Sequence, residues 1–164
     1  MKKIILLIPF LLFASIYNDF TKKEYKKICV SKNIKTNDQK ILSIVGISCV
    51  KTDRLYLLPI IINKLKKSKI ARTNAVYFAT IVLQKKLLYS FLFDGYPLKS
   101  FSFPRGDYIL SVVFENLKRG NFEKSGDIYK IPLQNKTIYF YRLGDKMMID
   151  EYSGGKLIKS RWFR

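Results

Sequence analysis

The chain changes character at Asp94 and Gly95, and this change constrains its fold more than any other feature. Before this point the sequence holds long apolar runs with a spacing of three and four residues, which is typical of helices. After it, short segments of alternating apolar and polar residues are separated by glycine-containing turns, which is typical of antiparallel strands. The order of the two regions predicts an α+β fold, in which an N-terminal helical layer packs with a C-terminal antiparallel β-meander.

Capping residues and apolar spacing predict five helices. They cover residues 19–29, 38–50, 55–66, 75–92 and 108–118. The fourth is the longest, and we expect it to be the central helix, capped by Asn74 and carrying Gln84 on its narrow polar stripe. Lys85 and Lys86 interrupt its apolar run, which disfavours a membrane span. Gly46 in the second helix permits a close approach to a neighbouring segment.

The strands are predicted from alternation and turn residues. They are Phe101–Phe103, Ile128–Pro132, Lys136–Leu143, Lys146–Tyr152 and Lys156–Phe163. The order of elements is similar to that of cystatin-like and nuclear-transport-factor-like α+β folds, and the resemblance concerns element order alone. We therefore divide the chain into a leader, residues 1–17, a helical region, residues 18–95, and an α+β region, residues 96–164. The last two are expected to form one globular unit.

The N-terminus has the layout of a secretory signal, because two lysines are followed by an apolar run from Ile4 to Ile16 and then by polar residues. A helix of this length falls short of the roughly 30 Å hydrocarbon core of a bilayer. We therefore predict an exported protein, periplasmic or secreted, that is cleaved after Ala14 or Ser15. Neither site has small residues at both positions that a signal peptidase reads. An uncleaved anchor that holds the protein on the periplasmic side of the membrane is the alternative.

The formal net charge of +19 favours acidic partners. An anionic envelope polymer, a membrane surface or a protein partner is expected. The lysines are spread along the chain and outnumber the arginines, which disfavours a dedicated nucleic-acid module. A merely solvated basic surface is the competing interpretation.

Histidine is absent from the chain, which excludes Ser-His-Asp and Cys-His catalysis and histidine-ligated zinc. Asp150 and Glu151 are adjacent, and in a strand they point to opposite faces, so they are not expected to share one site. We identify no catalytic residue, no metal ligand and no small-molecule cofactor motif. The sequence therefore favours a non-catalytic protein, and an enzyme that uses carboxylates and tyrosines is the least favoured reading.

Cys29 and Cys49 are the only cysteines. In an oxidising compartment we expect them to form a disulfide, which would add about 3 kcal/mol of stability by closing a loop of about twenty residues. A tight antiparallel hairpin of the first two predicted helices would hold them about 16 Å apart. The bridge therefore requires residues 30–37 to run back alongside, or the helices to cross steeply. Two buried free cysteines are the alternative.

Two surface clusters are candidate binding sites. The densest positive cluster is a candidate anion-binding site and consists of Lys64, Lys66, Lys67, Lys69 and Arg72. The C-terminal cluster is a candidate partner surface and consists of Arg161, Trp162, Phe163 and Arg164. A solvated connection between helices and a simple anchor for the last strand are the respective alternatives. Together these features predict a small exported basic protein with a binding or accessory role at the cell envelope, and a membrane-tethered structural component is the second hypothesis.

Overall fold

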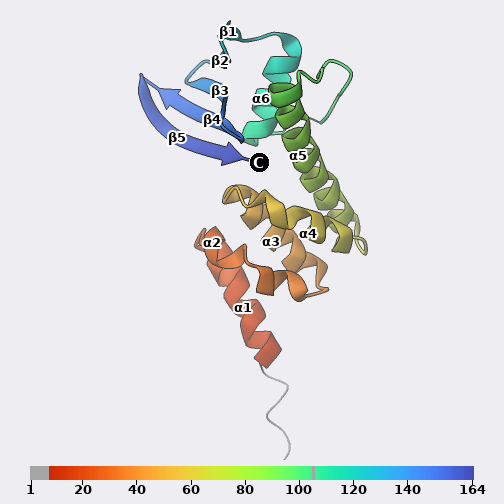
Figure 1. Cartoon of the computed structure of the whole chain (residues 1–164). Helices are drawn as coiled ribbons and strands as arrows, with labels where there is room; N and C mark the ends of the chain where they lie inside the picture. The colour runs from red at the N-terminus through yellow and green to blue at the C-terminus, as the bar shows by residue number, and fades with distance from the viewer. Residues whose placement is uncertain (1–7, 105) are drawn as a thin grey trace, which may run out of the picture. The chain divides into compact units, whose positions relative to one another are not determined.

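The computed structural model describes residues 8–104 and 106–164, with side chains from residue 15 onward. In these residues the chain forms six α-helices followed by a five-stranded antiparallel sheet (Figure 1). The predicted α+β class is confirmed. The chain divides into two compact units, Met1–Val82 and Leu83–Arg164, which we call the helical unit and the sheet unit. The positive end of the predicted leader, in residues 1–7, lies outside the described residues.

The helical unit begins with two helices where the sequence predicted one. Helix α1 covers Ile8–Thr21 and helix α2 covers Tyr25–Ile28, so the predicted helix over residues 19–29 is wrong. The chain reverses between them at Lys23, which has a left-handed φ of 59°. Helix α1 continues without a break through the predicted cleavage positions after Ala14 and Ser15.

The core of the helical unit forms around helix α3, Gln39–Lys51. Asp38 caps it as predicted, since one carboxylate oxygen accepts hydrogen bonds from the backbone N–H groups of Lys40 and Ile41 at 2.8 and 3.0 Å. Gly46 faces the ring of Phe78, and a Cβ atom at this position would overlap the ring. The predicted close approach at Gly46 is therefore confirmed.

A disulfide joins Cys29 and Cys49, whose Cα atoms lie 5.0 Å apart. Both residues are fully buried. The bridge forms because α2 is only four residues long and ends at Ile28, so Cys29 is not part of a long hairpin arm. Arg54 strengthens this junction by donating a hydrogen bond from Nη1 to the carbonyl oxygen of Cys29 at 2.8 Å. The predicted disulfide is confirmed.

Two further helices follow. A 3₁₀ turn at Leu55–Leu57 leads into helix α4, Leu58–Lys64, which has proline in its first turn as expected for Pro59. Helix α5 covers Lys69–Asp94 and begins six residues before the predicted start. The backbone N–H of Ala71 donates to Oγ of Ser68 at 3.1 Å, so this serine, and not Asn74, caps the helix.

Helix α5 buries a stripe that contains one polar residue. Gln84 is fully buried, whereas Val76 and Leu83 are exposed, so the predicted position of Gln84 on a solvent-facing stripe is wrong. Oγ of Ser111 donates to Oε1 of Gln84 at 2.7 Å, which offsets part of the cost of burying the amide. By length and composition α5 is able to cross a membrane, a test that core helices also pass.

The sheet unit contains the end of α5, helix α6, Ile109–Arg119, and the sheet. Helix α6 ends at Gly120, which adopts the left-handed conformation with a φ of 77°, as expected for a C-terminal glycine. The predicted strand at Phe101–Phe103 is wrong, because this segment is irregular. Its aromatic rings pack instead, and the ring of Phe103 meets the edge of Phe114 with centroids 5.1 Å apart.

The sheet is a meander of five strands in sequence order. The strands are β1 (Glu123–Ser125), β2 (Ile128–Pro132), β3 (Thr137–Leu143), β4 (Lys146–Ser153) and β5 (Lys156–Phe163). The four predicted strands after residue 120 are confirmed, and the short exposed β1 was not predicted. One face of the sheet is buried and holds Ile131, Ile138, Phe140, Met147, Ile149 and Phe163. The opposite face is left for polar and aromatic side chains.

Candidate functional site

The open face of β3 and β4 gathers aromatic and acidic side chains. Pairing between the two strands places Tyr139 opposite Asp150, and Thr137 opposite Tyr152. Tyr141 shares this face because side chains on a strand alternate with a period of two. The buried residues of both strands point to the other side, as the burial pattern shows. Three tyrosines and one carboxylate are thus neighbours on one surface.

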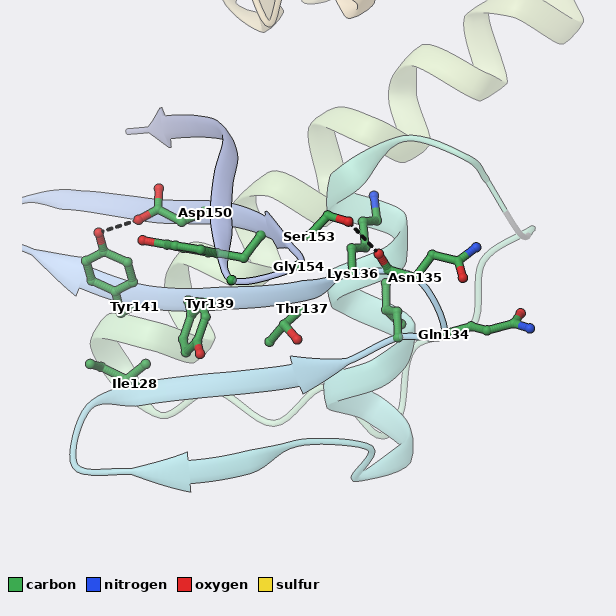
Figure 2. A pocket seen from close by; sticks show the side chains of 13 residues that line it. Ile128, Gln134, Asn135, Lys136, Thr137, Tyr139, Tyr141, Asp150, Ser153 and Gly154 are labelled. Atoms are coloured by element: carbon green, nitrogen blue, oxygen red, sulfur yellow. Dashed lines mark hydrogen bonds between the residues drawn. The ribbon is translucent and has the colours of Figure 1, made fainter.

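These residues line a groove with a volume of about 680 Å³, which we call the tyrosine groove (Figure 2). Its lining comes from β2, from β3 and β4, from the loop between β2 and β3, and from the turn between β4 and β5. Tyr139, Tyr141 and Asp150 lie toward one end, and Gln134 and Asn135 lie at the other. The groove therefore has an aromatic, acidic end and a neutral polar end.

The acidic end is organised by one hydrogen bond. The hydroxyl of Tyr141 donates to Oδ2 of Asp150 at 2.8 Å. Burial, this hydrogen bond and the nearby carboxylate raise the pKa of Tyr141 to about 12, so at neutral pH the phenol keeps its proton. The other oxygen of the carboxylate, Oδ1 of Asp150, is buried and has no hydrogen-bond partner. One of the two oxygens of this carboxylate therefore has no hydrogen-bond donor.

Lys136 is the other charged residue that lines the tyrosine groove, and its ammonium is engaged. It donates to Glu151, which also accepts from Arg161. Burial of the Glu151 carboxylate opposes ionisation, and the hydrogen bonds from the two cations more than offset this effect, so its pKa lies below the usual value. The side chains of Asp150 and Glu151 therefore point to opposite faces of the strand, as the sequence predicted.

The predicted anion-binding cluster is divided by the structure. The ammonium of Lys64 donates to the backbone carbonyl of Ile34 at 2.8 Å and is used within the fold. Arg72 donates to the carbonyl of Lys66 at 3.1 Å. The side chains of Lys66, Lys67 and Lys69 are exposed, and among the described residues no carboxylate pairs with them. Three of the five predicted cations are thus open to a ligand.

The predicted C-terminal surface is divided in a similar way. Phe163 is 4% exposed and belongs to the core, and Arg161 pairs with Glu151. Trp162 is 55% exposed, and Arg164 lies beside it with the guanidinium carbon 5.7 Å from the ring centroid. Lys146 approaches the same ring at 4.9 Å. Of the four predicted residues, Trp162 and Arg164 are exposed, and Arg164 also pairs with Asp145 at 2.9 Å.

Compared with known proteins, the chain matches no family model, no curated protein sequence and no solved structure. Across residues 8–104 and 106–164, no group of three or more acidic or cysteine side chains is arranged to hold a metal ion. The interpretation of the site therefore depends on its own geometry. The sheet unit has a groove in which one oxygen of the Asp150 carboxylate has no hydrogen-bond partner. The helical unit has three exposed lysines, Lys66, Lys67 and Lys69.

Proposed function

We propose that this chain is a small exported protein with a non-catalytic binding role at the cell envelope, where it contacts an anionic polymer, membrane surface or protein through Lys66, Lys67 and Lys69. The disulfide between Cys29 and Cys49 supports an oxidising compartment, because such bonds persist outside the cytoplasm. The net charge of +19 supports attraction to an anionic surface.

One observation carries the choice of this lysine cluster. The side-chain amide of Gln39 fixes the turn that presents it, since Oε1 accepts from the backbone N–H groups of Lys66 and Lys67 at 2.9 and 3.0 Å. Nε2 of the same residue donates to the carbonyl of Lys64 at 3.1 Å. A fixed backbone reduces the entropy lost on binding, because the positions from which the Lys66 and Lys67 side chains extend are set before a ligand arrives.

Binding to anionic and neutral lipid vesicles tests the proposal. The triple variant Lys66→Glu, Lys67→Glu, Lys69→Glu is expected to lose at least tenfold in affinity for vesicles that contain anionic lipid, since each lysine near such a surface contributes about 1 kcal/mol. A matched control reverses three exposed lysines elsewhere, Lys22, Lys26 and Lys99, with the same change in net charge. Equal losses in the two variants would show that overall charge, and not this cluster, determines binding.

Export is tested separately, by fractionation of cells and by the intact mass of the native protein. A soluble envelope fraction and a mature start near Ser15 or Ile16 are expected. A full-length protein in the cytoplasm would contradict the proposal.

A membrane-tethered structural component is the second candidate. The observation that favours it is the continuity of helix α1, which covers Ile8–Thr21 without a break at the predicted cleavage positions. In this case the native protein would retain its N-terminus and sediment with membranes. N-terminal sequencing distinguishes the two candidates, because cleavage removes the tether.

A further inference from the structure

The tyrosine groove does not share the strongly positive charge of the chain as a whole. The protein carries a net charge of +19, yet the two charged residues that line the groove are Lys136 and Asp150. The ammonium of Lys136 is bound to Glu151. Among the described residues, no ion pair engages the Asp150 carboxylate, and it makes the aromatic end locally acidic.

This carboxylate is incompletely satisfied. Tyr141 donates to Oδ2 of Asp150 at 2.8 Å, whereas Oδ1 is buried without a hydrogen-bond partner. A buried charged oxygen that lacks a partner is unfavourable, and a positive charge close to it compensates for this cost. The groove is therefore expected to gain more from a cation than from a neutral or anionic ligand.

The tyrosine rings favour the same kind of ligand. Tyr139 and Tyr152 meet edge to face, with ring centroids 5.2 Å apart and planes inclined by 81°. Two perpendicular rings present aromatic surface in two directions, and the faces of aromatic rings attract cations. Tyr141 lines the same groove and adds a third ring.

We infer that the tyrosine groove binds a polar ligand through an alkylammonium group, which lies among Tyr139, Tyr141 and Tyr152 and faces Asp150. The neutral end of the groove, where Gln134 and Asn135 lie, receives the uncharged polar remainder of the ligand (Figure 2). Ser153 closes this end by donating a hydrogen bond to the carbonyl of Asn135 at 3.1 Å. The inference is independent of the open lysines, which belong to the helical unit.

A pair of isosteric probes tests the role of the charge. Choline and 3,3-dimethyl-1-butanol have the same shape, and only choline carries a positive charge. Titration of the full chain, followed by amide resonances in ¹H–¹⁵N spectra, is expected to show choline binding at least about tenfold more tightly, with the shifts centred on residues of β3 and β4. Equal affinity of the two probes, no binding of any ammonium probe, or shifts confined to residues outside the groove would overturn the inference.

A second pair of probes identifies the type of ammonium. Glucosamine carries a primary ammonium and glucose does not. Tighter binding of glucosamine than of choline would assign a primary ammonium ligand, and the reverse order would assign a quaternary one. Either order supports the inference, provided that each cation exceeds its neutral counterpart.

The variant Asp150→Asn removes the charge and nearly preserves the shape of the side chain. It is expected to reduce choline affinity about tenfold and to leave the affinity of the neutral isostere unchanged. Asp94→Asn is the matched control, because Asp94 is exposed at the end of α5 and does not line the groove. An equal reduction in both variants would contradict the inference. Comparison of the two probes on the unmodified protein decides the question even where Asp150→Asn fails to fold.

Discussion

The helical unit and the sheet unit differ in how they are cross-linked and in where their charged side chains lie. The helical unit contains a covalent bond between Cys29 and Cys49 within an apolar core, and it exposes Lys66, Lys67 and Lys69 at its surface. The sheet unit holds the carboxylate of Glu151 between two cations and keeps Asp150 in its groove. A chain with a strongly positive net charge thus exposes a group of cations in one unit and places a carboxylate in the groove of the other.

The largest effect is expected from removal of the covalent bond. The double variant Cys29→Ala, Cys49→Ala should lower the free energy of unfolding of the helical unit by about 3 kcal/mol, because the unfolded chain is no longer constrained. Far-ultraviolet circular dichroism during denaturation reports on the helices. Trp162, the only tryptophan, reports on the sheet unit by fluorescence. A smaller shift in the fluorescence transition is expected, and coincident shifts would show that both units unfold together.

The second effect concerns the ion cluster of the sheet unit. The variant Glu151→Gln removes the carboxylate that Arg161 and Lys136 share, and the Glu151 side chain is only 11% exposed. We expect a loss of about 2 kcal/mol, measured by urea denaturation with Trp162 fluorescence. Glu123→Gln is the matched control, because its pair with Lys130 is exposed and screened by solvent and should contribute far less to stability. Similar losses in both variants would contradict the expectation that the part-buried contacts of Glu151 stabilise the fold more than an exposed ion pair does.

A smaller effect is expected from the close contact in the helical unit. The variant Gly46→Ala introduces a methyl group against the Phe78 ring and should destabilise the unit by about 1 kcal/mol, since the gain in helix propensity offsets part of the overlap. Addition of Phe78→Leu creates space for this methyl group. The double variant should therefore lose less than the sum of the single changes, and strict additivity in thermal denaturation would argue against the contact.

The smallest effect is a dependence on pH. Because the pKa of Glu151 is lowered in the folded state, its contribution to stability is present above the ordinary value of 4.5 and is lost as the pH falls through the lowered pKa. Denaturation midpoints measured between neutral pH and about pH 3 should fall more steeply in the original protein than in Glu151→Gln. Parallel curves would assign the acid sensitivity to other carboxylates.

The sheet could be predicted from the sequence because the patterns that specify it, strand alternation and turn residues, are local. Alternation identified β2 to β5, and the turn at Gly144 and Asp145 sets the register of β3 and β4. The α5 start was missed because Ser68 and Asn74 are both good capping residues, and only tertiary packing selects between them. The burial of Gln84 was missed because its partner, Ser111, is 27 residues away.

The tyrosine groove was also missed, although part of its signal was present. The period of two placed Tyr139 and Tyr141 on one face, and the two-residue turn implied that Asp150 and Tyr152 would lie opposite β3. The depth of the groove depends on the loop at residues 133–136 and on the turn at Ser153–Gly155, whose positions no local pattern gives. The open lysines were predicted as part of a cluster. That Lys64 is instead bound to a backbone carbonyl could be seen only in the folded structure.

The burial of both cysteines also sets an order of events. Thiol–disulfide exchange requires that a thiolate reach a sulfur atom, and neither Cys29 nor Cys49 has any exposed surface in the folded protein. The bond must therefore form while the helical unit is still open, before Cys29 and Cys49 become buried. Once the unit has folded, a reductant in solution can act only after unfolding. The redox state of the two cysteines is thus set by the environment in which the chain folds.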